Sequence, residues 1–327
     1  MHVLITGAAG MIGRKLTARL VKDGALNGEP IRKLILIDVV TPQQPEDFRG
    51  EVETATIDLS RPGAADKAIA RRPDVIFHLA SVVSGEAETD FEKGYQVNLD
   101  GSRALLEAIR LAGAGYVPKV VFTSSIAVFG APFPKSIPDD FHLTPLTSYG
   151  TQKAMVELML ADYSRRGFLA GVGIRLPTIC VRPGRPNKAA SGFFSGIIRE
   201  PLAGEEARLP VPETVRHTHA SPRAAVGFLI HATRLTPAQL GPRVNLTMPG
   251  VSCTVAEQIE ALTRIAGPKV AARIKRVPDA LVMRIVSGWP ERVDAARATA
   301  LGFKAESSFD EIIRVHIEDE LGGKIAV

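Results

Sequence analysis

The chain has 327 residues, of which 45% are hydrophobic, 23% charged and 6% aromatic. These proportions exclude a disordered chain, a collagen-like fibre and a coiled coil. The two cysteines, Cys180 and Cys253, are too few for a disulfide framework or a zinc cluster, so we expect no metal. No apolar run approaches the roughly 20 residues that cross a bilayer, and the first residues lack a secretory signal pattern. We therefore expect a cytoplasmic protein with no membrane partner.

The net charge of +5 is unevenly distributed. Between Asp162 and Glu200 there are seven lysines and arginines and no acidic residue. These basic residues are spread out and are not interleaved with aromatic side chains, as they are in nucleic-acid binding surfaces. We therefore expect a small anionic substrate and no nucleic acid.

The first 176 residues alternate short apolar runs with longer helical patterns. Most of the runs are continuously apolar, which is typical of strands that are covered on both faces. Alternation of strands and helices predicts a parallel sheet with helices on both sides. The predicted strands are 2–6, 33–37, 51–57, 74–79, 119–123 and 171–175, and the predicted helices are 11–23, 62–71, 92–113 and 149–166.

The sequence changes character after residue 176. Proline and glycine become frequent through 177–213, and helical patterns follow at 222–234, 254–266, 294–301 and 309–321. A short apolar run at 243–247 predicts a strand that returns to the sheet edge. The fold class is therefore α/β: residues 1–176 form a Rossmann-type, doubly wound domain, and residues 177–327 form mainly a smaller substrate-binding lobe.

A glycine-rich turn joins the first predicted strand to the first helix. Gly7 permits a tight turn, Gly10 lets the backbone approach a pyrophosphate, and Gly13 lets the helix pack closely on the strand. The helix begins at Met11 and Ile12, where free N–H groups and the positive end of the helix dipole favour phosphates. In this strand–turn–helix context the pattern predicts a dinucleotide site.

Residues at the ends of the next strands refine that site. Asp38 ends the second strand, where a carboxylate accepts hydrogen bonds from the ribose hydroxyls and repels a 2′-phosphate, so NAD is the expected cofactor rather than NADP. Asp58 and Leu59 close the third strand, where the adenine is expected. Small residues at the end of the fourth strand leave room for the cofactor, and the cofactor-binding candidates there are Leu79, Ala80 and Ser81. The adjacent His78 is expected to be a packed structural residue.

Ser124 and Ser125 end the fifth strand, and Tyr149 and Lys153 follow at the start of a helix. Residues four apart share a helix face, so the Lys153 ammonium can lie near the Tyr149 phenol. A tyrosine base near neutral pH needs its pKa lowered from about 10, and one cation at about 4 Å supplies roughly that stabilisation at an effective dielectric near 20. The sequence therefore predicts a chemical centre in which a serine hydroxyl holds the substrate oxygen.

These motifs, together with Asn98 in Val97-Asn98-Leu99, resemble the extended short-chain dehydrogenase/reductase family, also called the NAD-dependent epimerase/dehydratase family. The resemblance implies that Tyr149 accepts the proton, that Lys153 lowers its pKa and binds the nicotinamide ribose, and that Ser125 orients the reacting oxygen. It also implies that Asn98 lies by the cofactor and supports the strand–helix junction. The nicotinamide is expected along Leu176, Pro177 and Thr178, and a homodimer through the helices 92–113 and 149–166.

The substrate is the least constrained part of the prediction. The chain lacks the asparagine and Tyr-Gly-Pro that usually follow the sixth-strand arginine in sugar-nucleotide epimerases. Instead, Arg182 and Arg185 offer guanidinium groups that suit a carboxylate. The segment resembles dehydrogenases of four-carbon sugar acids, which implies oxidation of the 2-hydroxyl, with Ser81, Ser124, Ser125 and Tyr149 near the substrate. The alternatives are an L-threonine 3-dehydrogenase, a nucleotide-sugar epimerase or dehydratase, and an NAD-sensing regulator without turnover.

Overall fold

The computed structural model describes residues 1–113, 115–184 and 190–326. Its centre is a seven-stranded parallel sheet in the order β12-β8-β7-β6-β1-β4-β5. The Rossmann-type α/β fold expected from the sequence is confirmed, including the late strand that returns to the edge beside β8. The strands are β1 (His2–Thr6), β4 (Lys33–Asp38), β5 (Glu51–Thr56), β6 (Val75–His78), β7 (Lys119–Ser125), β8 (Ala170–Leu176) and β12 (Asn245–Thr247).

Alternate residues of each strand bury against helices on opposite faces of the sheet. Val3 and Ile5 of β1 pack in the same cluster as the buried residues of α1 (Met11–Asp23) and α8 (Pro222–Ala232). Leu4, between them, packs on the other face with α2 (Ala64–Ile69), α5 (Gly101–Leu111) and α6 (Ser148–Arg165). This two-sided burial is why the strands read as continuous apolar runs.

The predicted helix 92–113 is three segments rather than one. Helix α4 (Phe91–Gly94) leads into a π-helical turn over Tyr95–Asp100, and α5 follows from Gly101. A π-helical turn inserts one extra residue per turn and is frequent at functional sites. Asn98 lies within this turn, so its side chain is displaced from the position that a regular helix would give it.

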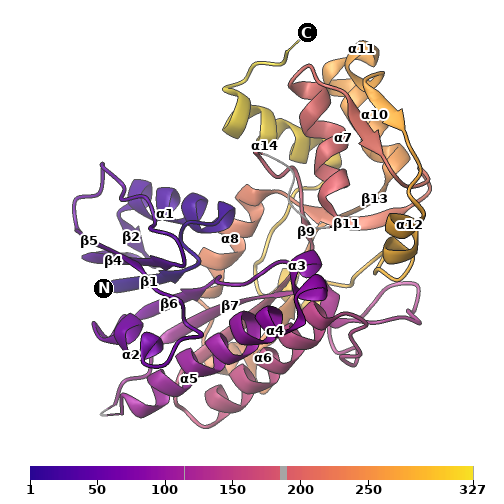
Figure 1. The fold of residues 1–327 in the computed structure, drawn as a ribbon. Coiled ribbons are helices and arrows are strands. Elements are labelled where there is room, and N and C mark those ends of the chain that lie inside the picture. Colours follow the sequence, from indigo (N-terminus) through magenta and orange to yellow (C-terminus); the bar gives the residue numbers. More distant parts are fainter. Residues whose placement is uncertain (114, 185–189, 327) are drawn as a thin grey trace.

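The second lobe has a hydrophobic core of its own. Its buried residues come from α7 (Gly192–Leu202), α10 (Val255–Ala266) and α14 (Phe309–Leu321), and Figure 1 shows these helices gathered away from the sheet. Capping by Thr254 and Ser308 accounts for the starts of α10 and α14. The lobe also holds a three-stranded sheet of β9 (Thr178–Ile179), β11 (Arg216–Ala220) and β13 (Val251–Thr254), and the parallel pair β10 (Ala207–Leu209) and β14 (Ile274–Arg276).

Smaller elements complete the fold. The predicted helix 294–301 is the short α13 (Ala296–Ala300). The others are β2 (Ala25–Leu26), β3 (Glu29–Pro30), α3 (Ser84–Thr89), a 3₁₀ turn (Ile126–Val128), α9 (Pro237–Leu240), α11 (Pro268–Ala271) and α12 (Ala280–Val286).

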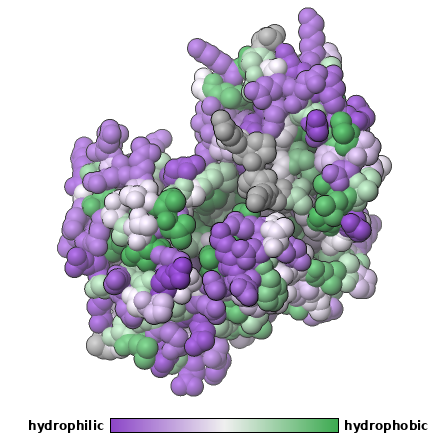
Figure 2. Space-filling view, in the orientation of Figure 1, coloured by the Kyte–Doolittle hydropathy of each residue, from purple (hydrophilic) through white to green (hydrophobic). Residues whose placement is uncertain are grey.

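Parts of the second half of the chain pack against the first domain. Helix α8 packs under the main sheet, and the carboxyl-terminal turn of α14 contacts the first domain through an ion pair between Glu320 and Lys15 of α1. On the same helix, Asp319 and Glu318 pair with Arg223 of α8. Figure 2 shows the surface notched between the two lobes, with hydrophobic residues lining part of the notch.

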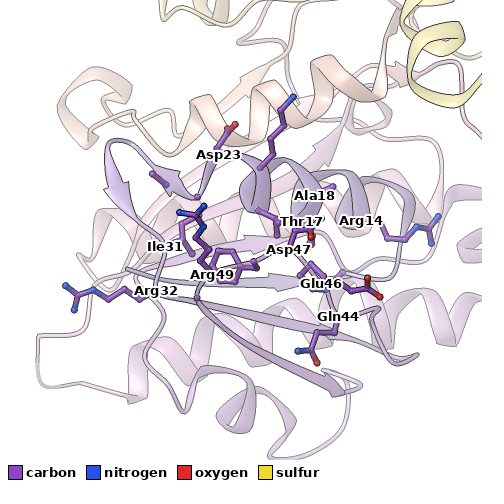
Figure 3. A pocket seen from close by; sticks show the side chains of 18 of the residues that line it. Arg14, Thr17, Ala18, Asp23, Ile31, Arg32, Gln44, Glu46, Asp47 and Arg49 are labelled. Carbon is purple, nitrogen blue, oxygen red and sulfur yellow. The ribbon is translucent and has the colours of Figure 1, made fainter. Parts of the chain in front are cut away.

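The connection from β4 to β5 has no helix. Segment 39–50 runs back along α1 instead, and a hollow of about 1390 Å³ lies between that helix and residues 43–50 (Figure 3). Its lining includes Arg14 and Thr17 but none of the three residues predicted to do chemistry. Within the part of the chain that the structure describes, no helix is both long and apolar enough to cross a bilayer. The cytoplasmic location stays a prediction.

Candidate active site

The glycine-rich turn is built so that a larger residue would not fit. Gly7 has φ +74°, and a Cβ there would lie 2.7 Å from the Ala80 backbone nitrogen. A Cβ on Gly13 would lie 2.3 Å from the Gly7 carbonyl oxygen. No side chain caps the start of α1 at Gly10. The first turn of α1, at Met11 and Ile12, is therefore open to an anion, as a dinucleotide pyrophosphate requires.

Asp38 is held at the edge of this turn. One carboxylate oxygen accepts a 2.9 Å hydrogen bond from the Ala9 N–H and the other accepts a 2.7 Å bond from the Val39 N–H. Each oxygen keeps a lone pair, because an ionised carboxylate offers about four acceptor positions. The geometry therefore fits a residue that accepts hydrogen bonds from ribose hydroxyls.

Asp58 is committed mainly to its own turn. Burial raises its pKa, but hydrogen bonds from Ser60 and the charge of Arg61 more than offset this and hold the pKa below its ordinary value. The Ser60 hydroxyl donates at 2.6 Å and its N–H at 3.0 Å. Leu59 beside it is buried. The contact of this pair with adenine stays a prediction.

Asn98 is saturated by protein partners. Its side-chain oxygen accepts from the Ser81 hydroxyl and the Val82 N–H, both at 2.8 Å. Its amide donates to the Val82 carbonyl and, at 2.8 Å, to Gln152. The side chain is 1% exposed. Asn98 thus ties the end of β6 to the π-helical turn and to α6, as expected for a residue that supports this junction, and its contact with the cofactor stays a prediction.

Leu79 and Ala80, which precede Ser81, are only partly buried, so this strand end stays open. His78 is different: it is 3% exposed, and its ring bonds to the hydroxyls of Thr6 and Ser102 at 2.8 and 2.9 Å. Burial lowers its pKa to about 3, so the ring is neutral. His78 is a packed structural residue.

The structure brings Ser125, Tyr149 and Lys153 together at the end of β7. Helix α6 begins just before Tyr149, where the Thr147 hydroxyl accepts a hydrogen bond from the Gly150 N–H. Ser125 lies close enough to the Tyr149 phenol to lower the pKa of that phenol. The Lys153 ammonium donates a 2.9 Å bond to the Thr123 carbonyl and lies 5.6 Å from the centre of the Tyr149 ring.

Burial opposes the charged forms of both groups. It raises the pKa of Tyr149, against the charge of Arg182 and the nearby Ser125 hydroxyl. It lowers the pKa of Lys153 to about 7, against the charge of Glu157. The sequence argument named Lys153 as the cation of this chain that lowers the pKa of Tyr149. In the folded protein the charge of Arg182 opposes the effect of burial on the pKa of Tyr149.

Ser124 does not face this site. It is 2% exposed, and its hydroxyl donates a 2.5 Å hydrogen bond to the buried carboxylate of Glu157. Successive side chains of a strand point to opposite faces, so Ser125 and Ser124 cannot both face the cleft. This position does not favour a contact between Ser124 and the substrate, which stays a prediction.

Arg182 is fixed beside the base by the second lobe. Its backbone N–H donates to the Ser195 hydroxyl at 3.0 Å, and its Nε donates to the Ile179 carbonyl at 3.1 Å. Its own carbonyl accepts a 2.7 Å bond from Arg199 of α7. Burial lowers the pKa of the guanidinium. Arg185 lies outside the described residues.

Two features of the site were missed in the sequence. His217 of β11 bonds to the Pro290 carbonyl and to the Thr178 hydroxyl, both at 2.8 Å. A carbonyl only accepts, so Nδ1 carries the proton and Thr178 donates to Nε2, which leaves the Thr178 oxygen as an acceptor. The second missed residue is Glu157. Its position four residues after Lys153, on the same face of the helix, could have indicated it. Pro177 precedes Thr178 at the end of β8, where the nicotinamide is expected.

The model of the NAD dependent epimerase/dehydratase family matches residues 3–219. The chain belongs to this family. Its cofactor is NAD, and it is an NAD-dependent oxidoreductase.

Two relatives match almost the whole chain. The D-erythronate dehydrogenase of Cupriavidus necator is 51% identical over 323 residues, which cover 98% of each chain. The D-erythronate dehydrogenase of Haemophilus influenzae is 43% identical over 98% of this chain and 100% of its own length.

Solved structures agree with this fold. A protein from Agrobacterium tumefaciens, named a nucleoside-diphosphate-sugar epimerase, is 64% identical with a TM-score of 0.98 over 100% of this chain and 96% of its own. The L-threonine dehydrogenase of Cupriavidus necator has a TM-score of 0.84 at 22% identity over 98% of this chain and 99% of its own, a likeness of fold alone.

Proposed function

We propose that this family member oxidises the 2-hydroxyl of a four-carbon sugar acid, D-erythronate, to the 2-oxo acid. The observation that carries the proposal is the position of Arg182, which the Ser195 hydroxyl and the Ile179 carbonyl hold near enough to the Tyr149 phenol for its charge to act there. A carboxylate anchored on this guanidinium brings the hydroxyl on the adjacent carbon to the base. The names of the two full-length relatives support the same substrate.

The residues divide the reaction as follows. Arg182 binds the carboxylate through a charge-assisted hydrogen bond. Ser125 holds the oxygen of the 2-hydroxyl, and the Tyr149 phenolate takes its proton. Bound NAD would supply the acceptor for the hydride that leaves C2, and its cationic ring would add to the positive charge that favours the phenolate. Lys153 holds the nicotinamide ribose and supports the same phenolate.

Other contacts are proposed around this centre. Ser81 donates its hydroxyl proton to Asn98, so its oxygen is free to accept a bond from a substrate hydroxyl. Thr178 presents an acceptor where the nicotinamide amide group passes. Arg185 is a second candidate for the carboxylate.

A nucleotide-sugar epimerase is the second candidate. It is favoured by the name of the 64% identical protein from Agrobacterium tumefaciens. The run from Arg175 to Gly184 argues against it, because it lacks the asparagine and the Tyr-Gly-Pro typical of such enzymes.

The test is the rate of NADH formation, followed by absorbance, with D-erythronate, L-threonine and UDP-sugars in parallel. We expect turnover with D-erythronate and its loss in Tyr149→Phe. Turnover with L-threonine alone, or interconversion of a UDP-sugar without net NADH, would overturn the assignment. A binder of NAD with no turnover on any sugar acid would be the regulator instead.

We also propose that the enzyme is a homodimer. Large apolar side chains are exposed along α6 and near it: Leu158 is 65% exposed and Met155 38%. Phe91, Leu111 and Leu146 are also exposed, at 60%, 67% and 65%. A second copy pairing through α5 and α6 would cover such residues. Light scattering is expected to give twice the chain mass, and the mass of one chain in Leu158→Glu; a wild-type monomer would refute the proposal.

A further inference from the structure

Glu157 is a buried carboxylate one helical turn after Lys153. It lies on the same face of α6 and is fully buried. Its oxygens accept the Ser124 hydroxyl at 2.5 Å and Arg175 through Nε at 3.0 Å and Nη2 at 2.8 Å. The ion pair with Arg175 and the hydrogen bond from Ser124 therefore fix this carboxylate behind the Tyr149–Lys153 pair.

The partners of Glu157 are themselves held in place. Arg175, on β8, donates from Nη1 to the Asp139 carbonyl at 2.9 Å. The Asp139 side chain accepts the Thr247 N–H at 2.7 Å and pairs with Arg297 at 3.1 Å. The carboxylate of Glu157 is thus bonded directly to residues of β7 and β8 and is linked to β12 through Arg175 and Asp139.

The charges around Lys153 make this carboxylate important. The Lys153 ammonium lies near the Tyr149 phenol on α6 and the neutral His78 ring on β6. It also lies 4.8 Å from the centre of the Phe122 ring on β7. Arg175 lies beyond Glu157 and adds positive charge. Among the residues that the structure describes, Glu157 is the carboxylate whose charge acts on Lys153. Lys153 is 2% exposed, and burial without a nearby carboxylate would favour its neutral amine.

We propose that Glu157 is a positioning residue of the reaction: its carboxylate, fixed by Arg175 and Ser124, keeps the Lys153 ammonium charged and directed at the Thr123 carbonyl and the cofactor ribose. Glu157 touches neither substrate nor cofactor, and it acts through Lys153. The kinetic part of this inference rests on the proposed dehydrogenase function, whereas the titration of Lys153 does not.

The first test reads Lys153 directly. Lysines are labelled with ¹³C at Cε, the Lys153 signal is assigned by its loss in Lys153→Arg, and its pH titration is followed by NMR. In Glu157→Gln we expect the titration midpoint to fall by about one pH unit or more, a tenfold or larger loss of charged lysine above the midpoint. A folded variant with the wild-type midpoint would overturn the proposal, whatever the substrate is.

The second test reads catalysis on D-erythronate. We expect kcat of Glu157→Gln at neutral pH to fall about tenfold or more, with its pH profile shifted, while KM for the sugar acid changes little. Asp310→Asn removes one negative charge from the Arg264–Asp310 pair of the second lobe and serves as the matched control, with no shift expected. An unshifted profile in the variant would mean a purely structural ion pair.

A third variant guards against loss of folding. Glu157→Gln leaves Arg175 buried without its carboxylate, which is destabilising, whereas replacing both partners of a buried pair is often tolerated. Glu157→Gln with Arg175→Met should therefore fold and still show the lowered Lys153 midpoint. If wild type titrates as expected but oxidises no sugar acid, the proposed substrate fails and the role of Glu157 stands.

Discussion

Replacing Gly7 with alanine separates backbone strain from steric blockage of the nucleotide turn. Gly7 has φ +74° and a Cβ would lie 2.7 Å from the Ala80 nitrogen and 2.8 Å from the Leu79 carbonyl carbon. Gly24, at the end of the same helix α1, has φ +62° and nothing within 4 Å of its Cβ position. The two substitutions share the left-handed strain of about 1–2 kcal/mol. Gly7→Ala adds overpacking against backbone, about 1–3 kcal/mol more.

The assay is chemical unfolding together with NADH binding by fluorescence titration. Gly7→Ala is expected to lose about 2–5 kcal/mol of unfolding free energy, the sum of the two effects. Gly24→Ala should lose only the first. NADH affinity should fall at least tenfold in Gly7→Ala, because the turn must shift away from the phosphates, and stay unchanged in Gly24→Ala. If Gly7→Ala bound NADH as tightly as its control, the turn would not be the pyrophosphate site.

Three further outcomes are expected. Asp38→Ala should reduce the preference for NAD over NADP by about tenfold or more, measured as the ratio of kcat/KM values, since it removes the charge that repels a 2′-phosphate; an unchanged ratio would exclude Asp38 from that role. Arg182→Met should raise KM for the sugar acid by roughly 2 kcal/mol of lost binding, about thirtyfold, with NADH affinity unchanged; equal loss of both would instead indicate a disturbed fold. Lys153 has a folded pKa of about 7, below its ordinary value. The unfolded chain therefore binds more protons between pH 7 and about 10.4, and unfolding free energy should rise with pH there in wild type more steeply than in Lys153→Met; parallel curves would contradict the burial argument.

The main sheet could be predicted because most of its strands are buried on both faces. Such burial leaves a continuous apolar run in the sequence. Strands β1, β4, β6, β7 and β8 are covered on both faces, so each reads as a short apolar run at nearly its true bounds. Helix α14 was predicted at its true bounds, because Ser308 caps its start and Gly322, in the left-handed region, ends it.

The second lobe was harder to predict, because its short strands depend on partners that are far apart in the sequence. Strands β9, β11 and β13 have two to five residues and pair with partners far along the chain, which local pattern does not encode. Helix α7 was missed, since it contains Pro201 and begins in a run of glycine and phenylalanine. The π-helical turn at Tyr95–Asp100 does not interrupt the hydrophobic pattern of a helix, so the sequence predicted one continuous helix over 92–113.

The site divides in a similar way. Tyr149 and Lys153 share a helix face at a fixed spacing, so their juxtaposition followed from the sequence. The orientation of Ser124 depends on strand register, which two consecutive serines do not reveal. The position of Arg182 beside Tyr149 depends on the pairing of β9 with β11, a contact that only the folded lobe provides.

The return of α8 and β12 to the main sheet limits how this protein can be recombined. Since the edge of β8 and one face of the sheet are completed by residues 222–247, cutting the chain at 176 would leave an open strand edge and an uncovered apolar surface. A chimera that exchanges specificity with a relative must therefore keep these two elements with the nucleotide half and graft the flanking stretches around them. Evolution of new substrates in this architecture is accordingly expected by changes within those flanking stretches rather than by shuffling of a terminal module.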